Sequence, residues 1–97
     1  MNIAWSPEAI QDLISLRAYI AEESPAGARR IVLRILHGVE YLLPDNPHIG
    51  RPGRLPGTRE LVIPQTPYIV PYRVKGEAIQ ILRVYHGARR WPESFQL

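Results

Sequence analysis

The chain has 97 residues, of which 45% are hydrophobic and 22% are charged, and its net charge is +3. A chain of this length forms one domain, residues 1–97, and buries roughly 65% of its unfolded surface around a single core. The absence of cysteine excludes disulfides and thiolate metal sites and fits a reducing compartment. The start of the chain has no signal-peptide pattern, and no apolar run approaches the roughly 18 residues of a membrane span. We therefore expect a cytoplasmic protein that does not contact membranes.

The charge is distributed unevenly along the chain. Residues 1–45 carry four basic and six acidic groups, a net charge of −2, whereas residues 46–97 carry eight basic and three acidic groups, a net charge of +5. Eleven of the twelve cations are arginines, whose planar guanidinium binds carboxylate or phosphate through two hydrogen bonds. The pattern is compatible with a solvated basic surface. The preference for arginine favours an anionic partner, either nucleic acid or an acidic protein.

The first elements expected are a short strand, residues 2–5, and two helices. Ser6 and Ser24 can each cap a helix, and each is followed by a proline, which suits the first helical position. Only about two residues separate the helices, so they should form an antiparallel hairpin. The residues expected on the apolar face of the first helix are Ile10, Leu13, Ile14, Leu16 and Ile20, and those of the second are Ala28, Ile31, Val32, Ile35, Val39 and Leu42.

Strands follow the second helix after an irregular loop, residues 44–57, which carries four prolines and three glycines. The segments that predict strands are residues 58–63, 68–74 and 78–86, with a tight hairpin between the last two. Pro71 has no amide hydrogen, so it should face a sheet edge, a bulge or the non-bonded side. The order β-α-α-β-β-β predicts an α+β fold, in which the helical hairpin packs on one face of a small antiparallel sheet.

Strict alternation assigns the side chains of the last two strands to opposite faces of this sheet. The more apolar set should lie under the helices, and its members are Tyr68, Val70, Tyr72, Val74, Ile79, Ile81, Arg83 and Tyr85. Ile69, Arg73 and His86 should then line the open face, beside the arginine-rich end of the chain. Polar groups are therefore expected to gather where the sheet is uncovered.

In this order, the motifs "GRPGR", "PYIVPYRV" and "RVYHGARRWP" resemble the RelE/ParE superfamily of toxins from type II toxin–antitoxin systems. The resemblance runs from about residue 3 to residue 92. It implies a cytosolic bacterial protein that is silenced by a cognate antitoxin, ParD-like or similar, and that meets operator DNA only through the antitoxin complex. The sequence shows no metal-ligand cluster and no phosphate-cradling glycine loop, so we expect no metal and no cofactor.

The superfamily implies two mechanisms, because RelE-like members cut mRNA in the ribosomal A site and ParE-like members poison DNA gyrase. A metal-free ribonuclease needs proton-transfer groups and cations for the phosphate charge, and the candidates here are His86, Arg73 and Arg89. A strand-end histidine is also a common structural hydrogen-bonding residue. The two arginines, in turn, could pair with carboxylates or be solvated.

Compared with the ribonuclease branch, this candidate catalytic set is incomplete. Ile69 stands where many nucleases have an arginine, and Gly87 follows the histidine where relatives have a tyrosine. Gly53 falls near the position of a loop carboxylate in that subgroup. The sequence therefore resembles the gyrase-directed branch more closely, and no catalytic residue is favoured.

The leading hypothesis is a non-enzymatic toxin that binds gyrase through His86, Arg89, Arg90 and Trp91. A ribosome-dependent endoribonuclease is the alternative, and a toxin-fold protein that only helps its antitoxin bind operator DNA is a third possibility. Trp91 could instead pack on the edge of the domain.

Antitoxin contacts are expected at Arg17, Leu33, Arg73 and Arg89. For the first two residues there is a structural alternative. The stem of Arg17 can lie along the helical hairpin with its head in solvent, and Leu33 can be an isolated surface leucine.

Overall fold

A strand and a helical hairpin precede all the other strands of the molecule. The computed structural model describes residues 1–89 and 91. In this part of the chain the elements follow the predicted order, with a short extra strand in the loop and the last strand broken in two. The elements are β1 (Asn2–Trp5), α1 (Pro7–Ala21), α2 (Pro25–Leu42), β2 (Arg51–Pro52), β3 (Arg59–Val62), β4 (Tyr68–Lys75), β5 (Ala78–Ile81) and β6 (Tyr85–His86).

Both helices begin at a serine–proline pair, as predicted. Ser6 Oγ accepts a hydrogen bond from the Ala9 amide at 3.0 Å, and Ser24 Oγ accepts one from the Gly27 amide at 2.9 Å. Each bond satisfies one of the amides that have no partner in the first helical turn. The proline after each serine lacks an amide hydrogen that would otherwise need such a partner. The starting points of α1 and α2 are therefore set by the local sequence.

The strands form one sheet in the order β1-β5-β4-β3-β2, and β6 pairs with β4. Neighbouring strands are antiparallel except β1 and β5, which are parallel. The prediction of a wholly antiparallel sheet is therefore wrong at this edge. A parallel pair needs a long connection between its strands, and the helical hairpin with β3 and β4 supplies one.

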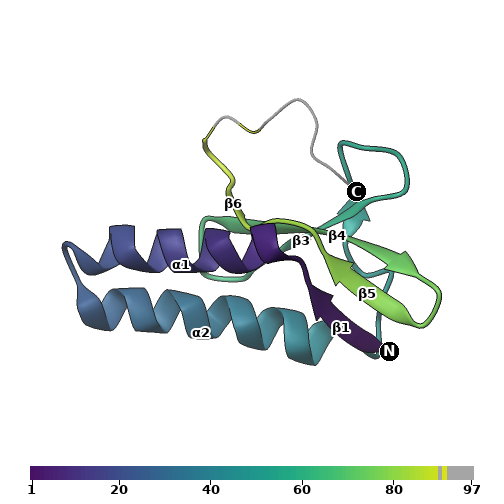
Figure 1. Ribbon diagram of the computed structural model, residues 1–97, viewed down its shortest axis with the longest axis horizontal. Helices are drawn as coiled ribbons and strands as arrows, with labels where there is room; N and C mark the ends of the chain where they lie inside the picture. Colours follow the sequence, from purple (N-terminus) through teal and green to yellow (C-terminus); the bar gives the residue numbers. More distant parts are fainter. Residues whose placement is uncertain (90, 92–97) are drawn as a thin grey trace.

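The helical hairpin covers one face of this sheet, so the core lies between the two layers (Figure 1). Tyr72, Ile79 and Ile81 from the sheet are completely buried, as are Ile35 and Val39 from α2. The expected inner face of β4 and β5 is confirmed, because its apolar residues are buried or packed against the core: Tyr68, Val70, Tyr72, Val74, Ile79 and Ile81. Apolar side chains of the two helices thus pack against the apolar face of the sheet and form one core with it.

The apolar face of α1 is narrower than predicted. Leu16 is buried, and Leu13 and Ile20 pack against the core beside it. Ile10 and Ile14, which were expected on the same face, are 46% and 57% exposed. A helix that rests on a sheet and on one neighbouring helix buries only part of its circumference, and these two isoleucines lie outside that part.

A bulge interrupts the last strand opposite Pro71. The amides of Leu82 and Arg83 both donate to the Pro71 carbonyl oxygen, at 2.9 and 3.5 Å, so two residues of one strand oppose one residue of the other. Pro71 has no amide hydrogen to donate in return. The Leu82 carbonyl oxygen instead accepts a hydrogen bond from Ser6 Oγ at 2.9 Å. Of the three positions expected for Pro71, the structure shows the bulge.

The bulge shifts the strand register by one residue. Tyr68 lies opposite His86, whereas unbroken alternation would have placed Tyr85 there. Val84 joins the core on the helix side, and His86 shares that side with Tyr68. The prediction that His86 lies on the open face with Arg73 is therefore wrong, because it assumed an unbroken strand.

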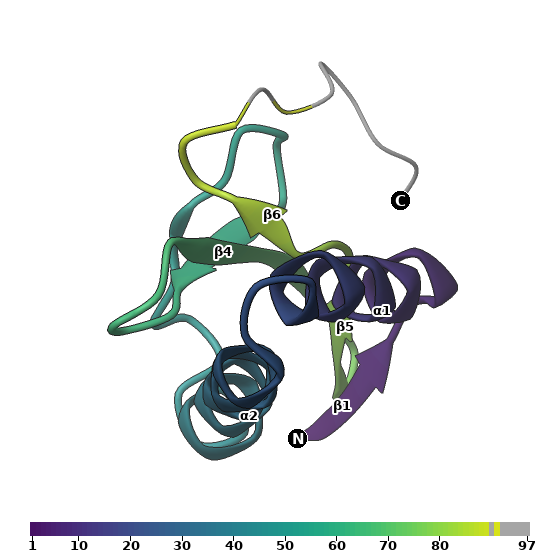
Figure 2. The same ribbon diagram turned by 90° about the vertical axis from the view of Figure 1, so that its left-hand side faces the viewer.

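The outer face of the sheet is also covered near β6. Ile69, Leu82 and Trp91 are at most 9% exposed, although they do not belong to the main core. Figure 2 shows the chain after β6 and the loop before β3 on the side of the sheet that faces away from α2. The expectation that Ile69 lines an open face is therefore wrong, since a second, smaller apolar layer forms there.

Truncation of Ile81 to alanine should lower the free energy of unfolding by about 2–5 kcal/mol, because it leaves a cavity at a completely buried position. Denaturant unfolding measures the difference. Val62→Ala is the matched control, since Val62 lies in a strand and is 48% exposed, and it should change the free energy by less than about 1 kcal/mol. Equal effects of the two substitutions would contradict the core described above.

Candidate functional site

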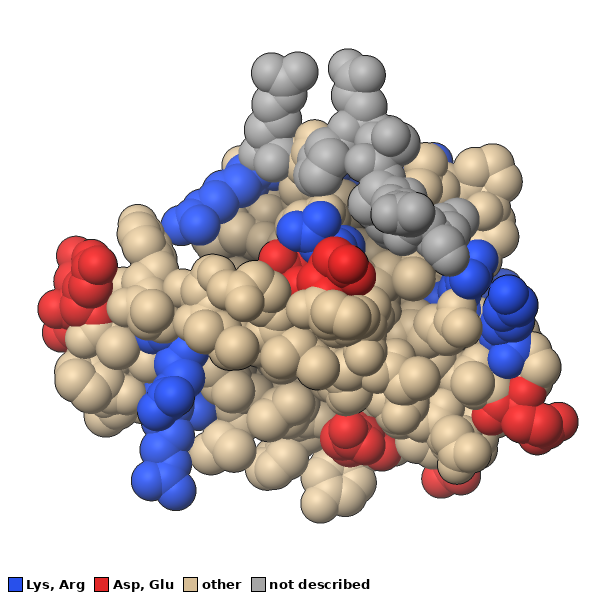
Figure 3. Space-filling view, viewed as in Figure 1, with Lys and Arg blue, Asp and Glu red and all other residues tan. Residues whose placement is uncertain are grey.

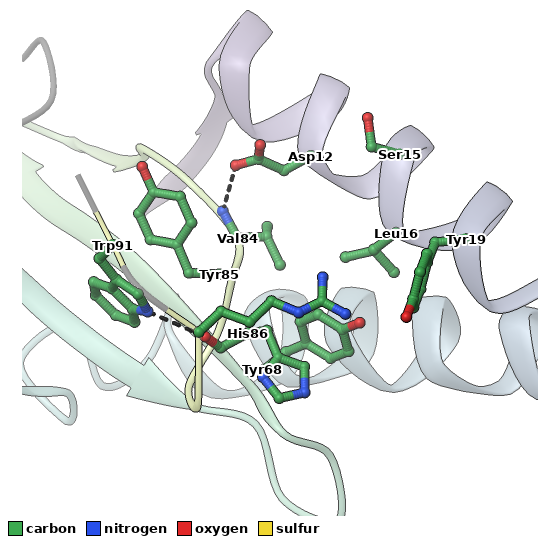
Figure 4. Close-up of a pocket in the computed structure, with 10 residues that line it drawn as sticks. Asp12, Ser15, Leu16, Tyr19, Tyr68, Val84, Tyr85, His86 and Trp91 are labelled. Carbon is green, nitrogen blue, oxygen red and sulfur yellow. Dashed lines mark hydrogen bonds between the residues drawn. The ribbon is translucent and has the colours of Figure 1, made fainter.

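A groove of about 380 Å³ lies between α1 and the end of the chain that the structure describes. We call it the tail groove, and Figure 4 shows its lining side chains. Helix α1 forms one wall, β4 contributes the floor, and Val84, Tyr85, His86, Arg89 and Trp91 form the other wall. The lining residues are Asp12, Ser15, Leu16, Tyr19, Tyr68, Val84, Tyr85, His86, Arg89 and Trp91.

Asp12 of α1 binds the bulge from the helix side. Its carboxylate accepts hydrogen bonds from Arg83 Nε at 2.8 Å and Arg83 Nη2 at 2.9 Å, and its Oδ2 also accepts one from the Val84 amide at 2.9 Å (Figure 4). The side-chain hydrogen bonds to Asp12 raise the pKa of Arg83, against the effect of partial burial. This two-bond arginine–carboxylate pair fixes both the distance and the orientation of its partners.

His86 enters the tail groove from β6. Its Nδ1 accepts a hydrogen bond from the Ala88 amide at 3.1 Å, so in the neutral ring the proton lies on Nε2. The ring meets the Tyr68 ring edge to face, with 5.5 Å between centroids. Burial raises the pKa of Tyr68, and the charge of Arg89 opposes this shift. The groove therefore places an imidazole, a phenol and a guanidinium near one another.

Arg89 extends from the chain after β6 to α1. Its guanidinium carbon lies 4.9 Å from the centroid of the Tyr19 ring, an arrangement in which the ring face attracts the cation. Tyr19 is 60% exposed and Arg89 is exposed as well, so both groups are accessible to a partner. Arg90, predicted as a target-binding residue, lies outside the described residues.

Trp91 anchors the chain after β6 to the outer face of the sheet. It is 6% exposed, and its indole Nε1 donates a hydrogen bond to the His86 carbonyl oxygen at 3.1 Å. Its ring lies 4.8 Å from the Tyr85 ring, and the Arg54 guanidinium carbon lies 3.6 Å from its centroid. The structure thus agrees with the alternative that Trp91 packs on the edge of the domain. Because Trp91 is buried, it would contribute to target binding by fixing the positions of neighbouring residues.

Glu60 connects the loop before β3 to this anchor. Its side chain is 5% exposed, and it accepts hydrogen bonds from Arg51 Nε and from the Arg54 amide, both at 3.1 Å. The stack of Arg54 on Trp91 is thereby held by a buried carboxylate. The sequence drew attention to the glycine at position 53 and missed Glu60, because no local pattern marks a buried glutamate.

Tyr72 ties the preceding part of the loop to the sheet. Its hydroxyl accepts a hydrogen bond from the Gly50 amide and donates one to the Pro47 carbonyl oxygen, both at 2.9 Å. A Cβ at position 50 would lie 2.7 Å from the Tyr72 ring, so only glycine permits this approach. Burial raises the pKa of Tyr72.

The structure brings together only part of the predicted ribonuclease set. His86 and Arg89 line the tail groove, whereas Arg73 lines a different hollow together with Trp5 and Ser6. Arg73 Nε donates a hydrogen bond to Gln80 Oε1 at 2.6 Å. The three groups therefore do not converge on one position where a phosphate could sit.

The predicted antitoxin contacts lie on separate parts of the molecule. Arg17 and Leu33 belong to the two helices, and both are exposed, Leu33 to 39%. Arg73 and Arg89 lie in the two different hollows described above. A single partner that meets all four residues would have to wrap around the domain.

Many arginines of residues 46–97 bind other parts of the same molecule. The acceptors are side chains for Arg51, Arg73 and Arg83 and backbone carbonyl oxygens for Arg59. On the face shown in Figure 3, basic side chains are scattered and acidic ones lie among them. These four arginines therefore serve internal structure, and the face shown in Figure 3 carries no single basic patch.

The described residues contain no group of three or more acidic, histidine or cysteine side chains placed to hold a metal ion. None of the helices in the same part of the chain is sufficiently long and apolar to cross a membrane.

The fold is that of a small α+β toxin of the RelE/ParE superfamily, as the following comparisons show. A solved structure described as "Chromosomal ParDE TA system from P. aeruginosa" superimposes with a TM-score of 0.79 at 35% identity, over 89% of this chain and 95% of that one. The family model for the ParE toxin of the type II toxin–antitoxin system parDE matches residues 3–91. The chain belongs to this ParE toxin family.

Two curated relatives agree with this assignment. The putative toxin Y4kP of Sinorhizobium fredii (strain NBRC 101917 / NGR234) is 42% identical over 92 residues, which are 95% of this chain and 94% of the relative. The toxin RelE2 of Caulobacter vibrioides (strain ATCC 19089 / CIP 103742 / CB 15) is 32% identical over 88 residues, which are 91% of this chain and 97% of the relative. The chain is therefore similar over nearly its whole length to proteins named after both branches of the superfamily.

Proposed function

We propose that this toxin acts in the cytoplasm by binding and poisoning DNA gyrase, without catalysing a reaction. The observation that carries the proposal is the separation of Arg73 from His86 and Arg89, which divides the set of residues that the nuclease hypothesis requires between two hollows. A binding toxin needs only exposed contact groups on a fixed framework. Arg89, placed by the anchor at Trp91, is such a group.

The alternative function is a ribosome-dependent endoribonuclease, and one observation favours it. The tail groove combines His86, Tyr68 and Arg89, and imidazole, phenol and guanidinium groups are able to move protons and stabilise phosphate charge. This set contains no loop carboxylate, because residue 53 is a glycine. A larger side chain would not fit at this position, since its Cβ would clash with Thr58. We therefore keep the nuclease as the second candidate.

We also propose that a cognate antitoxin of the ParD type, or a similar one, neutralises the toxin by wrapping it, and that operator DNA is met only through this complex. Exposed apolar side chains on the helical hairpin, Ile10, Ile14 and Leu33, would hold its apolar residues. Acidic residues of the same segment would meet Arg17 on the hairpin and Arg89 at the tail groove. An extended partner suits these surfaces, because they continue from Leu33 on α2 along α1 to Arg89, which lies over Tyr19 of α1.

Substitutions in the tail separate the two toxic mechanisms. If the toxin acts on gyrase by contact, His86→Ala should leave toxicity largely intact, whereas the double charge reversal Arg89→Glu with Arg90→Glu should abolish it. If the toxin is a ribonuclease, His86→Ala alone should lower the rate about 10²–10⁴-fold, because a proton-transfer group is lost. Parallel assays of gyrase supercoiling and of ribosome-bound mRNA cleavage by the purified protein measure the difference.

Two controls accompany these tail variants. The melting temperature should be unchanged, and the antitoxin should still bind through the helical hairpin, although more weakly to the charge-reversal variant because Arg89 is one of its proposed contacts. A harmless His86→Ala together with a fully toxic charge reversal would contradict both mechanisms and would move the active surface away from the tail.

Antitoxin association should depend on salt, because opposite charges on the two proteins accelerate their encounter. Raising the salt concentration from low to physiological levels should slow association, with a smaller effect on dissociation. Stopped-flow measurement with the native toxin and with Arg17→Gln gives the comparison, and the variant should show the weaker salt dependence. An association rate that does not change with salt would contradict the electrostatic part of the proposal.

A further inference from the structure

The chain after Ile81 has two possible registers against β4. Continuing the pairing of Ile81 with Tyr72 without a bulge would place Tyr85 opposite Tyr68 and turn His86 to the outer face. The structure has the other register, in which His86 is opposite Tyr68. A one-residue difference in register therefore decides whether His86 or Tyr85 lies opposite Tyr68 on the helix side of the sheet.

Pro71 and Ser6 account for the first part of this choice. Pro71 lacks the amide hydrogen that a regular ladder would use, so the Leu82 carbonyl oxygen has no partner on β4. The Ser6 hydroxyl donates a hydrogen bond to this oxygen instead. Neither residue reaches beyond the bulge. The first side-chain contact after it is made by Asp12, which accepts the Val84 amide at 2.9 Å.

Asp12 is suited to select the shifted register. Its three hydrogen bonds join α1 to Arg83 and Val84. These residues lie between β5 and β6, where the register against β4 changes by one residue. The Asp12 and Arg83 side chains are 17% and 27% exposed, so water competes only weakly for the bonds. The side-chain hydrogen bonds described for Asp12 all go to these two residues.

We propose that Asp12 is a positioning residue, whose carboxylate holds the bulge in the register that turns His86 toward α1 and brings Arg89 over Tyr19. This inference rests on the proposed function in one respect, because it makes Asp12 necessary for the tail to meet its target. Asp12 itself need not touch the target. It acts through the segment between Val84 and Arg89, which depends on the register for its direction.

The test compares Asp12→Ala and Asp12→Asn with the native toxin, each produced with the antitoxin and then separated from it. The readout of register is the nuclear Overhauser contact between the Tyr68 and His86 rings, whose centroids are 5.5 Å apart. Asp12→Ala should lose this contact and weaken gyrase inhibition roughly tenfold or more, because small displacements of supporting groups are costly to a site. Asp12→Asn keeps an oxygen that can accept the hydrogen bond from the Val84 amide. Its Tyr68–His86 contact and its gyrase inhibition should therefore lie between those of the native toxin and those of Asp12→Ala.

The matched control is Asp45→Ala, which removes an exposed carboxylate after α2 and should behave as the native protein. Circular dichroism and antitoxin binding should be retained by all variants. If Asp12→Ala does not fold, Asp12→Asn provides the test, and unfolding of both would overturn the proposal because Asp12 would then support the core.

The outcomes separate the positioning role from the proposed target. A Tyr68–His86 contact that persists in Asp12→Ala overturns the proposal whatever the target is. A lost contact with unchanged gyrase inhibition overturns its functional part. A lost contact in a protein whose native form does not inhibit gyrase contradicts the proposed target and supports the positioning role of Asp12.

Discussion

The missing amide hydrogen of Pro71 is the constraint on which the rest of the tail depends. A proline in the interior of β4 cannot complete the ladder with β5, so the chain opposite it forms a bulge and the Leu82 carbonyl oxygen turns to Ser6. Ser6 is also the cap of α1. One hydroxyl thus links the start of the first helix to the point at which the last strand changes register, and the two layers are held in one relative position.

Two surfaces arise from this change of register. On the helix side, His86 meets Tyr68 and forms the tail groove with residues of α1. On the outer side, Tyr85 meets Trp91, which Arg54 covers. The described residues after β6, which include Arg89, are therefore held from both sides of the sheet. This framework suits a toxin that acts by contact, since a fixed cation loses less freedom on binding than a mobile one.

The sequence predicted the helices, their caps, the order of the elements and the apolar residues under the helices, because these features follow from local patterns. It did not predict the direction of His86. Alternation was applied through Pro71 as though the strand were continuous, and the partner that holds the shifted chain, Asp12, lies 71 residues before Arg83. Both the parallel pairing of β1 and the burial of Glu60 also depend on contacts between distant segments, which no local pattern marks.

The most direct test of the account is the strand register in solution, read from cross-strand nuclear Overhauser contacts between backbone protons of the native toxin. Tyr72 should pair with Ile81 and Ile69 should pair with Tyr85, so that one extra residue lies between these two pairs on the second strand. Pairing of Ile69 with Val84 would show an unbroken ladder. That result would place His86 on the outer face and contradict the tail groove described here.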